Sequence, residues 1–173
     1  MKKILLIGLA GILLLSNFCF AKGFQNEPDG FRGIKWGTDI STLKDMEYFW
    51  TDPSYGGIKI YIRKSEDLHI GEAKLKRIGY GFWRGKFCDV WVITKSSVNW
   101  VGLRDAVFEK FGRGYQDNEF IEYYVWGGKI TLMSLEYNEV SKEGKLHILS
   151  KEIYKQQKAY QKQKAKEGAE TGF

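Results

Sequence analysis

The sequence predicts an α+β fold, an antiparallel sheet of about six strands with two packed helices. Three observations support this. Two pairs of aromatic-rich segments are each joined by a short glycine turn, which is typical of β-hairpins. Between the hairpins, apolar residues recur at spacings of three and four, which is typical of a helix. A chain of 173 residues is long enough to bury one core.

The folded part is expected to open at 31–41, a short apolar piece that leads into a first helix over 40–47. Asp39 precedes that helix, and its carboxylate can accept hydrogen bonds from the free amides of the first turn. Isoleucines then alternate with other residues over 58–62, which is the period of a half-buried strand.

The first hairpin is predicted to join 76–83 to 86–94 through Arg84-Gly85. A regular register pairs Tyr80 with Asp89 and places Trp91 on their face, with Phe82 and Phe87 beside them. Gly79 and Gly81 fall on the other face. Glycine weakens a strand unless another segment must pack closely against the backbone at that position. A helix is therefore expected to pack on the glycine face.

The second helix is predicted from a cap at Ser96-Ser97 to a stop at Gly112, with Trp100, Leu103, Val107 and Phe111 on its apolar side. A second hairpin joins 120–126 to 129–137 through Gly127-Gly128, and a last strand covers 145–149. The expected order is therefore one helix and three strands, twice.

The two ends of the chain differ from this domain in composition. Residues 1–21 combine Lys2 and Lys3, a short apolar run and small residues at the −3 and −1 positions of a cleavage site after Ala21. This pattern predicts a cleaved signal peptide and an exported protein, periplasmic or secreted. An uncleaved anchor, or acylation at Cys19, stays open. Residues 22–30 are expected to be a flexible leader, 31–150 the domain, and 151–173 a basic helical or disordered tail.

The opening Gly33-Ile34-Lys35-Trp36-Gly37, followed by the cap at Asp39, resembles that of a group of small exported bacterial proteins with a mixed helix and antiparallel-sheet domain. The resemblance implies export and this fold, but no reaction. The alternating order is also similar to the repeated layout of β-lactamase-inhibitor-like and outer-membrane-assembly lipoprotein folds, a likeness of topology alone.

Catalytic and cofactor motifs are absent from the sequence, which contains no nucleophile elbow, no zinc-protease helix and no phosphate-binding glycine loop. His69, His147 and Cys88 have no metal-ligand spacing, so neither a metal nor another cofactor is expected. After cleavage Cys88 is the lone cysteine, which excludes an internal disulfide. The net charge is +6, or +4 without the signal peptide, and nucleic acid is a poor partner for an exported chain.

Aromatic residues supply the candidate binding sites. Tyr80, Asp89 and Trp91 form either a platform for a ligand or part of the core, and core is favoured for the rings. The second hairpin offers a surface patch, and the tail offers a row of cations for anionic surfaces. The patch residues are Tyr124, Trp126 and Met133, and the tail residues are Lys155, Lys158, Lys162, Lys164 and Lys166.

These features predict an exported, non-enzymatic binding module of the cell envelope, whose partner is an envelope protein or an anionic envelope polymer. Two alternatives stay open. One is a periplasmic hydrolase that uses scattered carboxylates, Asp89 among them, because a carboxylate beside apolar rings can have a raised pKa. The other is binding of anionic polymer or lipid surfaces through the lysine-rich tail. No transmembrane segment is expected after signal cleavage.

Overall fold

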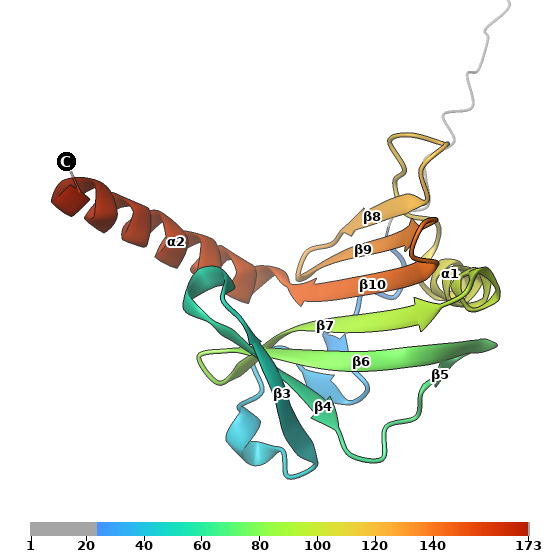
Figure 1. Ribbon diagram of the computed structural model, residues 1–173, viewed down its shortest axis with the longest axis horizontal. Coiled ribbons are helices and arrows are strands. Elements are labelled where there is room, and N and C mark those ends of the chain that lie inside the picture. Colours follow the sequence, from blue (N-terminus) through green and yellow to red (C-terminus); the bar gives the residue numbers. More distant parts are fainter. Residues whose placement is uncertain (1–23, 173) are drawn as a thin grey trace, which may run out of the picture.

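The computed structural model describes residues 24–172, and it confirms a mixed α+β fold with a large antiparallel sheet and two helices (Figure 1). The predicted signal peptide lies outside the described residues. Within residues 24–172 the strands number ten rather than about six. They are β1 Gly30–Phe31, β2 Ile34–Lys35, β3 Met46–Asp52, β4 Ile58–Arg63, β5 His69–Ile70, β6 Ala73–Trp83, β7 Lys86–Lys95, β8 Tyr123–Gly127, β9 Thr131–Asn138 and β10 Glu143–Ser150.

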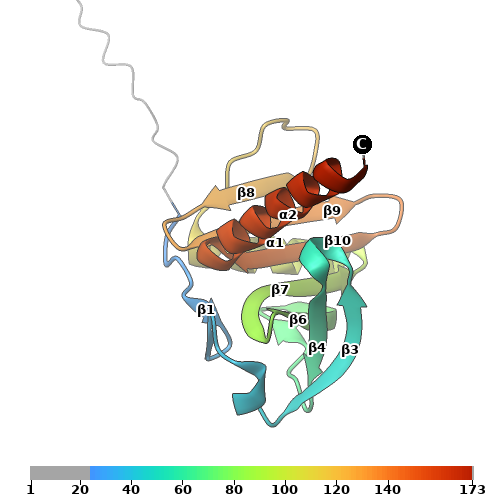
Figure 2. The ribbon, with the colours of Figure 1, turned by 90° about the vertical axis from the view of Figure 1, so that its left-hand side faces the viewer.

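The main sheet has the order β3-β4-β6-β7-β10-β9-β8, with β5 paired to β6. The strands β1 and β2 form a separate small hairpin. Helix α1 (Ser97–Phe111) packs on one face of the sheet, and helix α2 (Lys151–Gly172) projects from the end of β10 (Figure 1). Figures 1 and 2 both show β3 and β4 side by side and steeply inclined to β7 and β10, so this end of the sheet is strongly twisted.

The first predicted helix is wrong, because residues 46–52 form β3 instead. Only a single 3-10 turn, Ile40–Thr42, follows Asp39. Leu43 already has extended backbone angles, and the next segment, Met-Glu-Tyr-Phe-Trp-Thr-Asp, is rich in the aromatic residues that favour strands. The repeated order of helix and three strands therefore holds only for α1, β8, β9 and β10.

Asp39 nevertheless caps the short turn as predicted. Its Oδ1 accepts hydrogen bonds from the Ser41 hydroxyl at 2.7 Å and from the Ser41 amide at 2.9 Å, and its Oδ2 lies 3.2 Å from Lys86 Nζ. The two Ser41 bonds, followed by the bond from Lys86, lower the pKa of Asp39 from 3.8 to about 2.

We expect an NMR titration of the Asp39 carboxyl to give a midpoint near pH 2. Because the pKa is lower in the folded protein, the stability that Asp39 contributes is complete above about pH 4 and is lost as the pH falls toward about 2. Ser41→Ala is expected to raise the midpoint, since it removes the hydroxyl donor. A midpoint near 4 in the unmodified protein would contradict this cap.

The hairpin of β6 and β7 is confirmed, but its register shifts at a β-bulge. Phe82 pairs with Phe87 as predicted, whereas Gly81 pairs with Asp89 and Tyr80 with Val90. Cys88 is the extra residue of the bulge, and such a residue moves everything beyond it to the other face. Asp89 and Trp91 therefore lie on the face opposite Tyr80, which corrects the predicted grouping.

The bulge also changes which face the helix covers. Helix α1 packs on the side of Tyr80, Phe82 and Phe87, together with Val90 and Val92, rather than on the glycine side. The helix itself is as predicted: Ser96 caps it, and its Trp100, Leu103, Val107 and Phe111 are buried. Gly112 follows with φ 75°, a backbone angle that glycine adopts without strain.

The described part of the expected leader, residues 24–30, is fixed on the domain. Phe24 packs edge-on against Phe111 at 5.8 Å, and the Gln25 amide donates to the Phe111 carbonyl. Glu27 Oε1 accepts the backbone N–H groups of Ile130 and Thr131 at 2.7 and 2.8 Å. These contacts surround the Glu27 carboxylate with the turn between β8 and β9, in a segment for which the sequence predicted a flexible leader.

The C-terminal segment forms helix α2 through Gly172. Its first turns dock on the domain, with Ile153 buried and Tyr160 packed edge-on against Trp83 at 6.2 Å. Gln157 is also buried, beside Cys88. Beyond Tyr160 nearly every side chain is exposed, so the second half of α2 is polar on all sides.

Candidate functional site

The sheet face opposite α1 carries a groove of about 290 Å³, which we call the open-face groove. It runs from β3 across β4, β6 and β7 to β10. Its lining residues are Trp50, Asp52, Ile60, Arg77, Gly79, Trp91, Ile93 and Lys145. Trp50 lies on β3, the edge strand of the sheet, which is steeply inclined to β7 and β10 (Figures 1 and 2). Two indoles, three charged groups and an apolar floor thus surround one volume.

Glycine keeps the floor of the groove open. Gly79 lies in the middle of β6 and lines the groove, and a Cβ at this position would lie 3.1 Å from Ile60 Cγ2. The sequence predicted that something approaches this glycine closely. The close neighbour is Ile60 of β4. The groove, rather than a helix, lies over the glycine.

Trp91 forms the wall of the groove on the side of β10. The ring of His147 stacks on it with centroids 3.3 Å apart and an interplanar angle of 8°, and Lys145 Nζ lies 4.9 Å from the Trp91 ring. His147 Nε2 also contacts Asp89 Oδ2 at 3.4 Å. Trp91 is therefore held by its neighbours and half-buried, a preorganised wall rather than a mobile side chain.

Trp50 forms the wall on the side of β3, and 46% of its surface is exposed. Arg77 lies beneath the same strand, with its guanidinium 4.9 Å from the ring centroid of Phe49. Among residues 24–172, Arg77 has no carboxylate within salt-bridge distance, whereas Lys145 is paired with Glu136. The groove therefore contains a cation that forms no salt bridge within the described residues, near an exposed indole, and its lining also includes the Asp52 carboxylate. The guanidinium and the indole together can bind an anionic ligand with a flat or apolar body.

Asp89 is buried, and its Oδ1 has no hydrogen-bond partner in the described part of the chain. A Cβ at Gly81 would overlap this oxygen, so the glycine leaves room for the carboxylate. Asp89 lies beneath the groove, in contact with His147, and not at its surface. The structure thus brings Asp89 and Trp91 together through His147, a residue that the sequence left unassigned.

Tyr80 lies in the core and not in the groove. Its side chain is fully buried between Phe31 and Phe87, as the core alternative predicted. The hydroxyl donates to Glu66 Oε2, and burial, followed by that hydrogen bond, raises the pKa of Tyr80. No face of this ring is available to a ligand.

The surface patch expected on the second hairpin is wrong. Tyr124, Trp126 and Met133 are only 3%, 5% and 3% exposed. Phe108 of α1 packs edge-on against Tyr124 at 4.9 Å, and Trp126 Nε1 donates to the Gly112 carbonyl at 3.0 Å. The three side chains do share one face of the hairpin, but this face points toward α1.

The five lysines of the tail do not form one surface. Spacings of three and four place Lys155, Lys158, Lys162 and Lys166 on one side of α2, whereas Lys164 lies on the other side and pairs with Glu167 at 2.7 Å. Lys166 lies 3.8 Å from Glu170. Only part of the predicted row is therefore free of carboxylates within the described residues.

For the alternative of a hydrolase, the described residues contain two carboxylate–histidine pairs, Asp89 with the largely buried His147 and Asp67 with the exposed His69. Ser134 of β9 is the residue directly opposite His147 in the sheet, but no hydrogen bond joins the two in the described structure. Cys88 is buried beneath α2, and burial, followed by the charge of Asp89, raises the pKa of its thiol, which disfavours the thiolate. His69 is exposed and contacts Asp67.

Of the groove residues, only Trp91 was predicted as a site residue from the sequence, and Trp50 and Arg77 are among those missed. Trp50 follows the segment that was assigned to a helix, and Arg77 belongs to a strand whose twist carries it under β3. The run Tyr48-Phe49-Trp50 was the available signal, because three consecutive aromatic residues favour a strand over a helix.

Comparison with protein-family models, with curated proteins and with solved structures gives no match. Neither α1 nor α2, the two α-helices of the described part, is long and apolar enough to cross a membrane.

Proposed function

We propose that this chain is an exported, non-enzymatic binding module that takes an anionic envelope polymer in the open-face groove. The observation that carries this proposal is the exposed Trp50 beside Arg77, a cation with no salt-bridge partner among residues 24–172. An indole face is electron-rich and attracts the C–H groups of a sugar ring or an apolar chain, while the guanidinium attracts a carboxylate or phosphate.

Preorganisation supports the same proposal. Trp91 is stacked on His147 and lies near Lys145, and the floor at Gly79 needs no side chain to move. A site with few side chains to order loses little entropy when a ligand binds. An envelope protein docking at this face and a polymer bound by α2 are the competing readings, and both are outcomes of the experiment below.

The experiment is co-sedimentation of the purified protein with bacterial wall sacculi, which are polymers of sugar rings that carry carboxylates. We expect binding to weaken about tenfold for Trp50→Ala and for Arg77→Gln, because each removes one contact worth about 1.4 kcal/mol. Amidation of the sacculus carboxylates is expected to have the same effect as Arg77→Gln. Tyr48→Ala is the matched control, since Tyr48 is a similarly exposed aromatic residue of β3 outside the groove.

Variants of α2 separate the tail from the groove. Deletion of the whole helix would uncover Ile58, Trp83 and Cys88, so glutamine substitution of Lys155, Lys158 and Lys162 is the cleaner test. Binding that persists in this variant supports the groove, and binding lost only there assigns the polymer to the tail. Sacculi that release soluble fragments would favour the hydrolase. No sedimentation, together with a protein crosslinked at the groove, would favour an envelope protein.

A further inference from the structure

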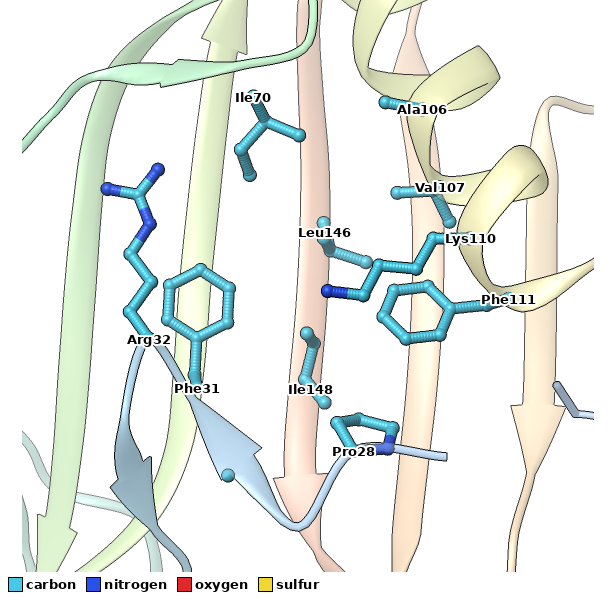
Figure 3. Close-up of a pocket in the computed structure, with 11 residues that line it drawn as sticks. Pro28, Phe31, Arg32, Ile70, Ala106, Val107, Lys110, Phe111, Leu146 and Ile148 are labelled. Carbon is cyan, nitrogen blue, oxygen red and sulfur yellow. The ribbon is translucent and has the colours of Figure 1, made fainter. Parts of the chain in front are cut away.

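A second cavity, of about 250 Å³, lies on the other side of the sheet, between α1 and the β1–β2 hairpin (Figure 3). Its inner wall is apolar and comes from elements far apart in the sequence. Leu146 and Ile148 of β10 form the floor, Val107 and Phe111 of α1 one side, and Phe31 of β1 the other. We call it the hairpin cavity.

The hairpin that closes this cavity is fixed in place. Arg32 follows β1, and its guanidinium donates to Glu66 Oε1, to the Asp67 carbonyl and to the His69 carbonyl. These bonds tie the hairpin to the segment before β6 and use most of the donors of the arginine. The hairpin beside the cavity is therefore held in place by hydrogen bonds, and the Arg32 guanidinium is used in forming them.

Lys110 is the other cation at the hairpin cavity, and its ammonium group forms no salt bridge within residues 24–172. Figure 3 shows its side chain reaching across the cavity from α1 toward Phe31. Its Nζ lies 5.5 Å from the Phe111 ring centroid, and among residues 24–172 no carboxylate lies within salt-bridge distance. An ammonium group therefore stands over an apolar cavity without an anion.

The size of the cavity limits the ligand. An apolar protein cavity of about 150 Å³ holds benzene, with its six heavy atoms. On the same scale 250 Å³ holds about ten heavy atoms, an acyl chain of about eight carbons with its carboxylate at the mouth. We propose that the hairpin cavity binds a medium-chain acyl carboxylate, with the chain against Leu146 and Ile148 and the carboxylate on Lys110.

The test uses octanoate as the probe and isothermal titration of the full purified chain. Octanol and octylammonium have the same chain without the negative charge. We expect octanoate to bind with one-to-one stoichiometry and about tenfold more tightly than octanol, because a charge-assisted hydrogen bond to Lys110 adds to the same apolar contact. Equal affinity for octanoate and octanol, or no octanoate binding at millimolar concentration, would overturn the proposal without any variant.

Two variants locate the site. Lys110→Gln is expected to weaken octanoate binding about tenfold and to leave octanol binding unchanged, while Lys44→Gln, an exposed lysine of the segment before β3, leaves both unchanged. Ala106→Phe fills the mouth of the cavity from α1 and is expected to abolish both. If that variant does not fold, Ala106→Leu replaces it. Octanoate affinity that is unchanged in Lys110→Gln would refute the assignment.

Discussion

Replacing Trp126 with alanine is expected to lower the free energy of unfolding by about 3–5 kcal/mol. Trp126 is almost fully buried against α1, so truncation leaves a cavity the size of an indole beside Phe108. It also leaves the Gly112 carbonyl without its donor at the end of α1, which adds to the cost. Since a domain of this kind is stable by only about 5–15 kcal/mol, the effect is a large fraction of the total.

Urea denaturation measures this change, with the slope of the transition checked for constancy. Phe120→Ala is the control, because Phe120 is 89% exposed just before the same hairpin, and we expect a change within about 0.5 kcal/mol. Trp126→Phe should fall between the two, since it keeps most of the apolar contact and loses the hydrogen bond. A Trp126→Ala variant as stable as the Phe120→Ala variant would restore the surface patch and contradict the burial described above.

The second large effect is expected at Gly144 of β10. A Cβ at this position would lie 2.7 Å from Trp100 Cε3 and 2.5 Å from Thr94 Oγ1. Trp100 cannot move aside, because it is buried and stacked on Tyr137 with ring centroids 5.2 Å apart. We therefore expect Gly144→Ala to lower the free energy of unfolding by about 2 kcal/mol through overpacking, measured by the same denaturation.

Gly127→Ala is the matched control for Gly144, since Gly127 also lies in a strand and a Cβ there meets nothing within 4 Å. Its expected change is within about 0.5 kcal/mol. If Gly144→Ala were equally neutral, α1 would not be seated on β10 as the structure has it. Such a result would also remove the support for the hairpin cavity, because the same helix forms one of its walls.

The open-face groove and the hairpin cavity lie on opposite faces of one sheet, and their proposed ligands differ. Trp50 and Arg77 belong to the groove, and Ala106 and Lys110 to the cavity. Their variants can therefore be combined, and independent sites should give additive changes. A loss of octanoate binding in Trp50→Ala would show that the two sites are coupled.

Local pattern alone determined much of this protein. The spacing of Trp100, Leu103, Val107 and Phe111, with Ser96 before and Gly112 after, suffices to define α1, because a helix forms from contacts three and four residues apart. The turn at Arg84-Gly85 likewise defines the hairpin of β6 and β7. The capping role of Asp39 also follows from sequence, since its partner is two residues away.

Tertiary structure decided which faces are buried and where a site can form. One extra residue, Cys88, moves Asp89 and Trp91 away from Tyr80, and no local pattern reports such a bulge. The side chains around Trp126 alternate between the two faces of the strand in the same way whether its face meets water or α1. Only the docking of the helix therefore buries Trp126. Trp50 and Arg77 line one groove although they belong to strands that are not neighbours in the sheet. Burial and convergence of this kind arise from contacts between distant segments, and sequence periodicity reports only near neighbours.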